Sequence, residues 1–187
     1  MATPEPTPQA EPLELTPTGK VILGMLAFGK NTGYEIKQFV DKSTRFFWAA
    51  SYGQIYPELK RLEDQGLVRG RSEPSGGRAR TVFELTDAGS AALNRWLSAD
   101  EEQLYELRDE GMLKLFFSDC APERRIENIR AMRERQERKL AQLREIEPIA
   151  QRGPEGPRLT LELGIGFTQW MVDWCRATER RLAGEHE

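Results

Sequence analysis

The sequence contains a single histidine, His186, which stands next to the last residue of the chain. Zinc sites, Ser-His triads and Cys-His dyads depend on histidine, and the ends of chains are usually mobile. The sequence also has no P-loop and no Gly-x-Gly-x-x-Gly run after a strand pattern. These absences exclude most metal-dependent and nucleotide-dependent enzymes, so we expect no enzymatic activity, no metal site and no cofactor.

Cysteines and long apolar runs are also scarce. Cys120 and Cys175 lie 55 residues apart without metal or redox spacing, which is typical of core thiols in a reducing cytoplasm. The longest nearly apolar run, Val21 to Gly29, is far shorter than the roughly 20 residues of a membrane span. We therefore predict a cytoplasmic protein without a membrane anchor. Four prolines, three glutamates and no basic residue in the first fourteen positions argue against a targeting peptide and predict a disordered tail over 1–14.

Charge is unevenly distributed, although the net charge of the whole chain is only −3 at pH 7. Residues 30–80 contain ten Lys or Arg and six Asp or Glu, a local net charge of +4. The remainder contains 17 basic and 24 acidic residues and carries −7. One contiguous basic block in an acidic chain is expected where one region meets phosphates and another meets protein or solvent.

The basic block is preceded and filled by helix patterns. Apolar spacing predicts a first buried helix over about 17–28. Thr32 and Glu35 have the spacing of a capping box at the start of a second helix. Ser51 and Gln54 have capping-box spacing too, which predicts a third helix that starts at Ser51.

The third helix has two different faces. Ile55, Leu59 and Leu62 recur at i, i+4 and i+7 and predict the buried face, and Gly66 ends the pattern. At 100° per residue the opposite face carries Gly53, Gln54, Pro57, Lys60, Arg61 and Asp64, with Tyr56 on its flank. Pro57 inside the helix predicts a loosened first turn beside Gly53, which lets backbone approach a partner. The alternative is a helix that starts near Gln54 and has Pro57 in its first turn.

A cationic hairpin follows the third helix. Alternating residues predict two strands joined by a turn over 73–78. Between Arg69 and Arg80, the ribbon carries the four arginines Arg69, Arg71, Arg78 and Arg80 against the single acid Glu73. Thr86 predicts the cap of a fourth helix, whose inward residues are expected to be Leu93, Trp96 and Leu97. This order of elements predicts a winged helix-turn-helix domain over 15–98.

Three segments resemble the PadR family of bacterial transcriptional regulators, namely GYEI at 33–36, SYGQIYPELKRLEDQGLV at 51–68 and RTVFELTDAG at 80–89. The family pattern includes Gly-x-[Ile/Leu]-Tyr-Pro-x-Leu-x-x-Leu-Glu and Tyr/Phe-x-Leu-Thr-x-x-Gly. The segment 159–182 is more weakly similar to the virulence-activator-like region of the longer members. Phe83 stands where the family commonly has Tyr, which removes a possible hydroxyl contact.

The resemblance implies a homodimeric regulator, usually a repressor, with its third helix in the major groove of double-stranded DNA and its wings on the flanking backbone. A two-fold protein matches a pseudo-palindromic operator. The residues predicted to bind DNA are Tyr34, Ser51, Tyr52, Gln54, Tyr56, Lys60, Arg61, Arg78 and Arg80.

Physical chemistry suggests separate roles for these residues. The four cations would neutralise phosphates, which gives salt-dependent affinity without sequence information. Gln54 is the best base reader, because its amide pairs bidentately with adenine, unless it serves only as the capping partner of Ser51. Ser51 and Tyr52 are expected to contact phosphate at the helix entry. Tyr56 resembles a family tyrosine that faces DNA, or packs on its neighbours, and Tyr34 is expected to pack between helices with its hydroxyl outward.

The second half is predicted to be helical over 99–187 and to form the dimer. A long helix is expected from Pro122 to about Glu147, with a heptad-like seam of Ile126, Ile129, Met132, Gln136, Leu140, Leu143 and Ile146. After a linker at 151–157, the last helix repeats Leu163, Phe167, Trp170, Trp174 and Ala177. We expect both helices to pair with a second subunit, chiefly through Ile129, Gln136, Leu140, Leu143, Leu163, Phe167, Trp170 and Trp174.

An aromatic stripe in the last helix suggests a ligand as well. Phe167, Trp170, Met171 and Trp174 would line an apolar site for a small aromatic or drug-like effector, as the family resemblance also suggests. The alternative is core and interface packing.

The sequence thus predicts a mainly α fold with a small β-hairpin wing, a winged helix-turn-helix domain followed by an all-α dimerisation region. A rival hypothesis is a winged helix that binds another protein, which requires an apolar outer face on the third helix. An enzyme built on carboxylates is a more distant alternative, because the acids lie mostly on the solvated sides of charged helices.

Overall fold

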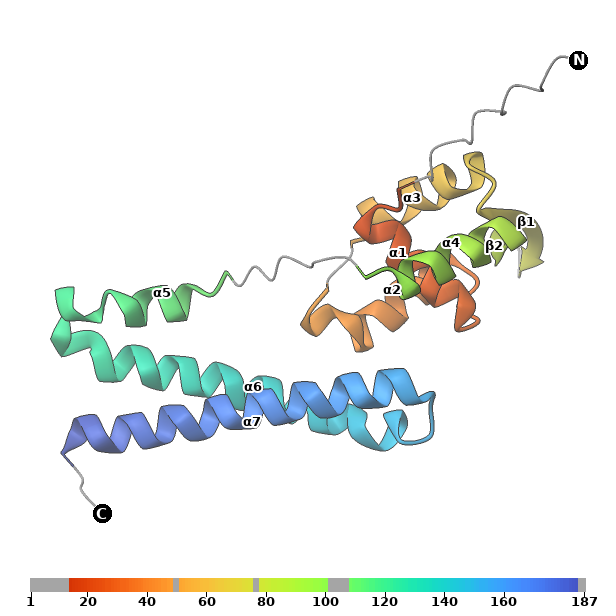
Figure 1. Ribbon diagram of the computed structural model, residues 1–187. Helices are drawn as coiled ribbons and strands as arrows, with labels where there is room; N and C mark the ends of the chain where they lie inside the picture. The colour runs from red at the N-terminus through yellow and green to blue at the C-terminus, as the bar shows by residue number, and fades with distance from the viewer. Residues whose placement is uncertain (1–13, 49–50, 76–77, 101–107, 185–187) are drawn as a thin grey trace, which may run out of the picture. The chain divides into compact units, whose positions relative to one another are not determined.

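The structure of the protein is a computed structural model that describes residues 14–48, 51–75, 78–100 and 108–184 (Figure 1). The predicted tail over 1–14 therefore lies outside the described residues, apart from Glu14. Internal contacts divide the chain into two units, Met1–Glu102 and Gln103–Glu187. None of the helices in the described residues has the length and apolar character needed to span a membrane.

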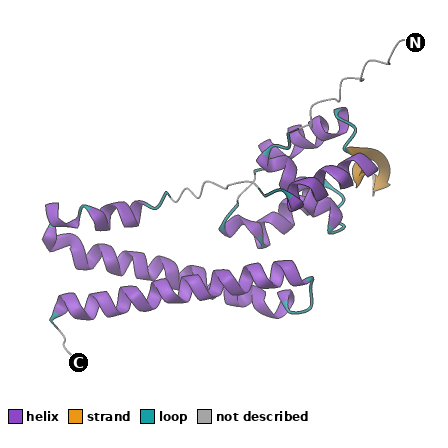
Figure 2. Ribbon diagram, in the orientation of Figure 1, coloured by secondary structure: helices purple, strands orange, loops and turns teal. Residues whose placement is uncertain are grey.

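The first unit has the predicted order of helices and strands (Figure 2). Its elements are α1 (Pro17–Ala27), α2 (Gly33–Lys42), the 3-10 turn η1 (Thr44–Phe46), α3 (Tyr52–Asp64), β1 (Val68–Ser75), β2 (Arg78–Leu85) and α4 (Asp87–Ser98). The two strands pair antiparallel, from Val68 opposite Leu85 to Ser75 opposite Arg78. The predicted winged helix-turn-helix arrangement is confirmed.

Short polar residues start the helices where the sequence predicts. Thr32 and Glu35 form the expected capping box of α2. Thr86 begins α4, and its hydroxyl accepts a hydrogen bond from the Gly89 N–H at 3.0 Å. Gly89 packs so closely on the segment between α3 and β1 that a Cβ there would lie 1.9 Å from the Leu67 carbonyl oxygen. Only glycine fits this contact between α4 and the chain that enters the wing.

One apolar core holds the first unit together. Its fully buried side chains are Ile22, Leu23, Ile36, Val40, Ile55, Leu59 and Leu62. Leu93 and Trp96 of α4 pack on this core as predicted. Leu97 does not, because its side chain is 65% exposed, so the predicted inward face of α4 was one residue too wide.

The wing is longer than the sequence pattern suggests. Glu73 and Pro74, which were predicted to lie in the turn, pair with Arg80 and Ala79 as part of the ladder. Pro74 is tolerated there because a two-stranded ribbon has only edge strands. Phe83 is buried in the core, and its N–H donates to the Asn31 carbonyl at 2.7 Å. The wing is therefore anchored to the chain between α1 and α2.

The second unit is entirely helical in its described part. It contains α5 (Glu110–Phe116), the 3-10 turns η2 (Ser118–Cys120) and η3 (Pro122–Arg124), α6 (Arg125–Ala150) and α7 (Glu155–Ala183). The helices α6 and α7 run antiparallel along each other (Figure 1). Pro148 lies inside the last turn of α6 and Pro157 in the first turn of α7, so the predicted linker over 151–157 is shorter than expected. A proline in a first turn removes no helical hydrogen bond, because the N–H there has no partner.

The apolar seam of α6 is covered by α7 of the same chain. Ile129, Met132, Leu140 and Leu143 are buried, together with Met171, Val172 and Cys175 of α7. The prediction that this seam pairs with a second subunit is therefore wrong for Ile129, Leu140 and Leu143. The heptad spacing identified a helix-packing surface but not the helix that covers it. Cys175 is the expected core thiol, with its pKa raised by burial, whereas Cys120 is exposed.

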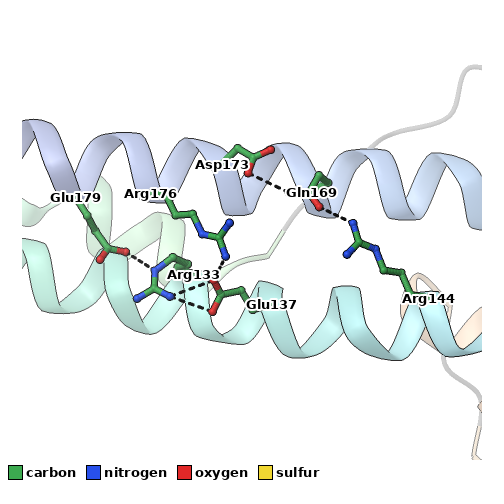
Figure 3. A network of polar contacts seen from close by, with 7 residues as sticks. All are labelled: Arg133, Glu137, Arg144, Gln169, Asp173, Arg176 and Glu179. Carbon is green, nitrogen blue, oxygen red and sulfur yellow. Dashed lines mark hydrogen bonds and ion pairs between the residues drawn. The ribbon is translucent and has the colours of Figure 1, made fainter. Parts of the chain in front are cut away.

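Charged side chains fix the register of α6 and α7 beside this seam (Figure 3). Arg133 donates to Glu179 at 2.7 Å and to Glu137 at 3.0 Å, and Arg176 donates to Glu137 at 2.7 Å. The hydrogen bond from Arg176 is the largest cause of the lowered pKa of Glu137. Further along, Arg144 donates to Gln169, which in turn donates to Asp173.

A carboxylate links α3 to the start of α1. The Thr16 hydroxyl donates to Glu58 Oε1 at 2.5 Å, and Arg61 Nη2 donates to the same oxygen at 2.6 Å. The Glu58 side chain is only 12% exposed. The hydrogen bond from Arg61, together with the weaker effect of the bond from Thr16, outweighs the opposing effect of burial and lowers the pKa of Glu58 below its usual 4.5.

We predict that Glu58→Gln lowers the free energy of unfolding at pH 7 by about 1–3 kcal/mol, because the charged acceptor is lost. Since the pKa of Glu58 is lower in the folded state than in the unfolded state, its stabilising contribution is present above about pH 4.5 and is lost as the pH falls through the folded value. Urea titrations between pH 3 and pH 7 should therefore show wild type and variant converging at acidic pH. Asp64→Asn, which removes an exposed carboxylate, is the control, and equal pH profiles for the two variants would contradict the prediction.

Candidate nucleic-acid interface

The helix α3 presents a polar face away from the core. Ile55, Leu59 and Leu62 are fully buried, while Gly53, Gln54, Pro57 and Lys60 are exposed, as the helical projection predicts. Pro57 lies inside α3, which starts at Tyr52 with Ser51 as its N-cap. The alternative of a helix starting near Gln54 is therefore wrong. Because proline has no N–H, the carbonyl of exposed Gly53 does not receive the usual helical hydrogen bond from the residue four positions on.

Ser51 and Gln54 form a capping box at the amino-terminal end of α3. The Ser51 N–H donates to Gln54 Oε1 at 2.9 Å, and the Ser51 hydroxyl approaches the same oxygen at 3.2 Å. Caps of this kind typically stabilise a helix by about 0.5–2 kcal/mol. Gln54 thus fulfils the capping role that the sequence left open, while its side chain remains exposed.

Two tyrosines lie near the start of α2. The Tyr56 ring packs on Gly33, where a Cβ would come within 2.7 Å of a ring carbon, yet half of its surface stays exposed. Tyr56 therefore packs on the start of α2 and keeps half of its surface exposed. The expectation that Tyr34 packs between helices is wrong, because its side chain is 56% exposed and its hydroxyl accepts from Gln38 Nε2 at 2.7 Å.

The two cations of α3 differ in accessibility. Lys60 points outward and makes an exposed ion pair with Asp64 at 3.2 Å. Arg61 is two-thirds buried against Glu58, and this hydrogen bond raises the pKa of its guanidinium. The structural role of Arg61 was missed in the sequence, although the i, i+3 spacing of Glu58 and Arg61 could have indicated it.

Two arginines of the wing form ion pairs with carboxylates of the wing itself. Arg80 pairs with Glu73 across the ladder at 3.3 Å, and Arg71 pairs with Glu84 at 2.5 Å. All four side chains are at least 40% exposed. Phosphates that approach the wing would therefore compete with these carboxylates.

The other residues predicted to bind DNA are described only in part. Ser51 lies at the entry of α3, as predicted for a phosphate contact. The backbones of Tyr52 and Arg78 lie in α3 and β2, but their side chains are outside the description. Glu63 was not considered in the sequence, and its carboxylate accepts the Gly70 N–H at 2.8 Å. It ties the end of α3 to the first strand of the wing.

The residues predicted for dimerisation and effector binding divide into two groups. Leu163, Phe167 and Trp170 are exposed, and the Phe167 and Trp170 rings lie 6.2 Å apart. Met171 is buried and Trp174 packs on the α6–α7 core. Gln136 is half-buried on α6, and its Oε1 is buried without a hydrogen-bond partner among the described residues. The four proposed effector residues therefore do not share one surface within the chain.

Comparison with known proteins gives matches in both units. Residues 22–95 match the Transcriptional regulator PadR-like family, and residues 107–183 match the Virulence activator alpha C-term family. The negative transcriptional regulator PadR of Bacillus subtilis is 37% identical over 100 residues, which are 53% of this chain and 55% of that protein. The chain thus spans about half the length of this relative in sequence.

Solved structures extend the similarity over most of the chain. The crystal structure of Bacillus subtilis PadR in complex with operator DNA has a TM-score of 0.79 and 26% identity, covering 87% of this chain and 97% of that one. PadR in complex with p-coumaric acid has a TM-score of 0.75 and 25% identity, covering 88% and 97%. The helix order, the two-stranded wing and both family matches agree, and the chain contains a domain of the Transcriptional regulator PadR-like family followed by a Virulence activator alpha C-term region.

Proposed function

We propose that the protein is a sequence-specific DNA-binding regulator that acts in the cytoplasm as a dimeric repressor and leaves its operator when a small molecule binds. This proposal depends on the exposed face of α3. That face carries Gln54, Tyr56 and Lys60, whereas the opposite face of the helix is apolar and fully buried. A protein-binding winged helix would require apolar side chains at these positions. The similarity to a relative whose structure contains operator DNA supports the same reading.

The proposed contacts divide by chemistry. Lys60 and Arg80 would meet phosphates, in exchange for their present carboxylate partners Asp64 and Glu73. The amino-terminal end of α3 would enter the major groove, since the amino-terminal residues of a recognition helix contact the base edges. The exposed residues Tyr56 and Gly53 lie on that same end.

We predict that Lys60→Ala and Arg80→Ala weaken binding to all DNA sequences. Each should reduce the slope of log affinity against log salt by about 0.9, the value for one phosphate contact. A binding site would first be selected from a randomised DNA pool, and affinities measured by fluorescence anisotropy at several salt concentrations. Arg95→Ala, which removes an exposed cation from α4, is the control. An equal loss with Arg95→Ala, or a folded protein that enriches no sequence, would refute the proposal.

A second copy of the chain is the proposed occupant of the outer face of α7. Leu159, Leu163, Phe167 and Trp170 recur with steps of four and three, and each is more than half exposed. Exposed apolar stripes of this kind mark interaction surfaces. A symmetric pair of chains buries the same stripe twice and presents two copies of α3 to a two-fold operator.

We expect Leu163→Glu to convert the dimer into a folded monomer, because the new carboxylate would be buried without a partner in the interface. Light scattering coupled to size-exclusion chromatography gives the mass, and far-UV circular dichroism reports the fold. Ala141→Glu adds the same charge to an exposed position of α6 and should stay dimeric. A wild-type monomer, or a dimer that persists in Leu163→Glu, would contradict this part of the proposal.

The effector is proposed to be a small aromatic molecule held by the exposed rings of Phe167 and Trp170 where two chains meet. The similarity to a relative crystallised with p-coumaric acid supports this chemistry. The neighbouring rings of Phe167 and Trp170 supply a flat apolar wall, which a second chain would close.

We predict that p-coumaric acid weakens binding to the selected operator at least tenfold and quenches tryptophan fluorescence. Phe167→Ala should reduce both responses, since stacking surface is lost, while operator affinity without the acid is retained in protein shown to be dimeric. Benzoate and cinnamate serve as related probes. Operator affinity that none of the three acids changes would rule out an aromatic acid as effector.

A further inference from the structure

The amide oxygen of Gln54 is fully occupied inside the protein. Two donors of Ser51 converge on it, the backbone N–H at 2.9 Å and the hydroxyl at 3.2 Å. A carbonyl oxygen has two lone pairs, so these contacts use its accepting capacity. The backbone N–H also fixes the orientation of the amide, because a flipped amide would place NH2 against N–H.

The NH2 group of Gln54 is therefore the part left to meet a partner. The side chain is exposed in the first turn of α3, and the described residues offer its NH2 no hydrogen bond. Gln54 shares its face with Pro57, which has no N–H to offer, and with Lys60, which is a second donor. This end of the helix presents donors from its side chains and no free side-chain acceptor among Gln54, Pro57 and Lys60.

We propose that Gln54 reads the major groove as a hydrogen-bond donor only, and selects guanine or thymine over adenine and cytosine. This inference rests on the proposed DNA-binding function. Guanine presents two adjacent acceptors, N7 and O6, and thymine presents O4. Cytosine presents only its N4 donor, and adenine places its N6 donor beside N7. At cytosine, donor therefore faces donor, and at adenine the single acceptor N7 lies beside the opposing N6 donor, so adenine offers fewer acceptors than guanine.

Recognition by the Gln54 NH2 group alone differs from the bidentate pairing with adenine that the sequence suggested. That pairing needs Gln54 Oε1 to accept from adenine N6, which requires the oxygen to leave both Ser51 contacts. A cap that stays closed on DNA makes Ser51 a positioning residue, because it determines which end of the amide points outward.

Gln54→Glu is the sharpest test. A carboxylate keeps the cap, since it accepts from Ser51 as glutamate does in a capping box, but it presents acceptors outward. Selection from a randomised DNA pool should give guanine or thymine at the Gln54-dependent position for wild type and cytosine for Gln54→Glu. We expect wild type to prefer guanine or thymine at that position by about two- to tenfold. Gln54→Ala should lose this preference. Lys60→Ala is the matched control, because it should weaken binding without changing any base preference.

The outcomes separate clearly. A wild-type preference for adenine that disappears in Gln54→Ala would show that the cap opens on DNA and would overturn the inference. Identical selected sites for wild type and Gln54→Ala would overturn it as well, because Gln54 would then be a cap alone. A folded dimer that enriches no sequence would refute the proposed function itself. Melting temperatures of the variants check that Gln54→Glu retains the cap.

Discussion

The burial of one side of α3 is the constraint on which the rest of the first unit depends. Ile55, Leu59 and Leu62 have no exposed surface, and each such burial is worth about 1.5–3 kcal/mol. Turning the helix by a single residue would rotate its side chains by about 100° and bring Lys60 or Gln54 toward the core. The apolar contacts therefore decide which polar residues face outward. The cap at Ser51, the Glu58 contacts and the Glu63 bond to the wing then fix the two ends of the helix.

Local signals in the sequence predicted most of the first unit. Capping residues such as Thr32 and Thr86 act within three residues of themselves, so a one-dimensional pattern contains their whole interaction. Contacts between distant residues were less visible. Arg61 was assigned to phosphate, although Glu58 is its i, i+3 neighbour, because the contact of Glu58 with the Thr16 hydroxyl forms only when α1 and α3 pack. Tyr34 and Leu97 were placed inward because helical spacing does not show where a core ends.

The candidate interface is cationic in sequence but largely paired in structure. Asp64, Glu73 and Glu84 each neutralise one exposed cation of α3 or the wing. Exposed pairs of this type contribute little to stability, about 0–1 kcal/mol. They do keep the surface from carrying unbalanced charge in the absence of DNA, and in the proposed complex the cations would exchange these carboxylates for phosphates. Affinity for DNA is then a difference between two sets of ion pairs, which composition alone does not reveal.

The second unit shows that a heptad pattern does not determine which helix will cover it. The α6 seam was expected to meet another chain, but α7 covers it, and the Arg133 network closes its polar edge. Because that core is complete within one chain, the unit does not require a second copy in order to fold. In the proposed dimer, folding and assembly would then be successive events, so subunits would exchange between pairs without unfolding, and the population of pairs would respond to the amount of protein in the cell.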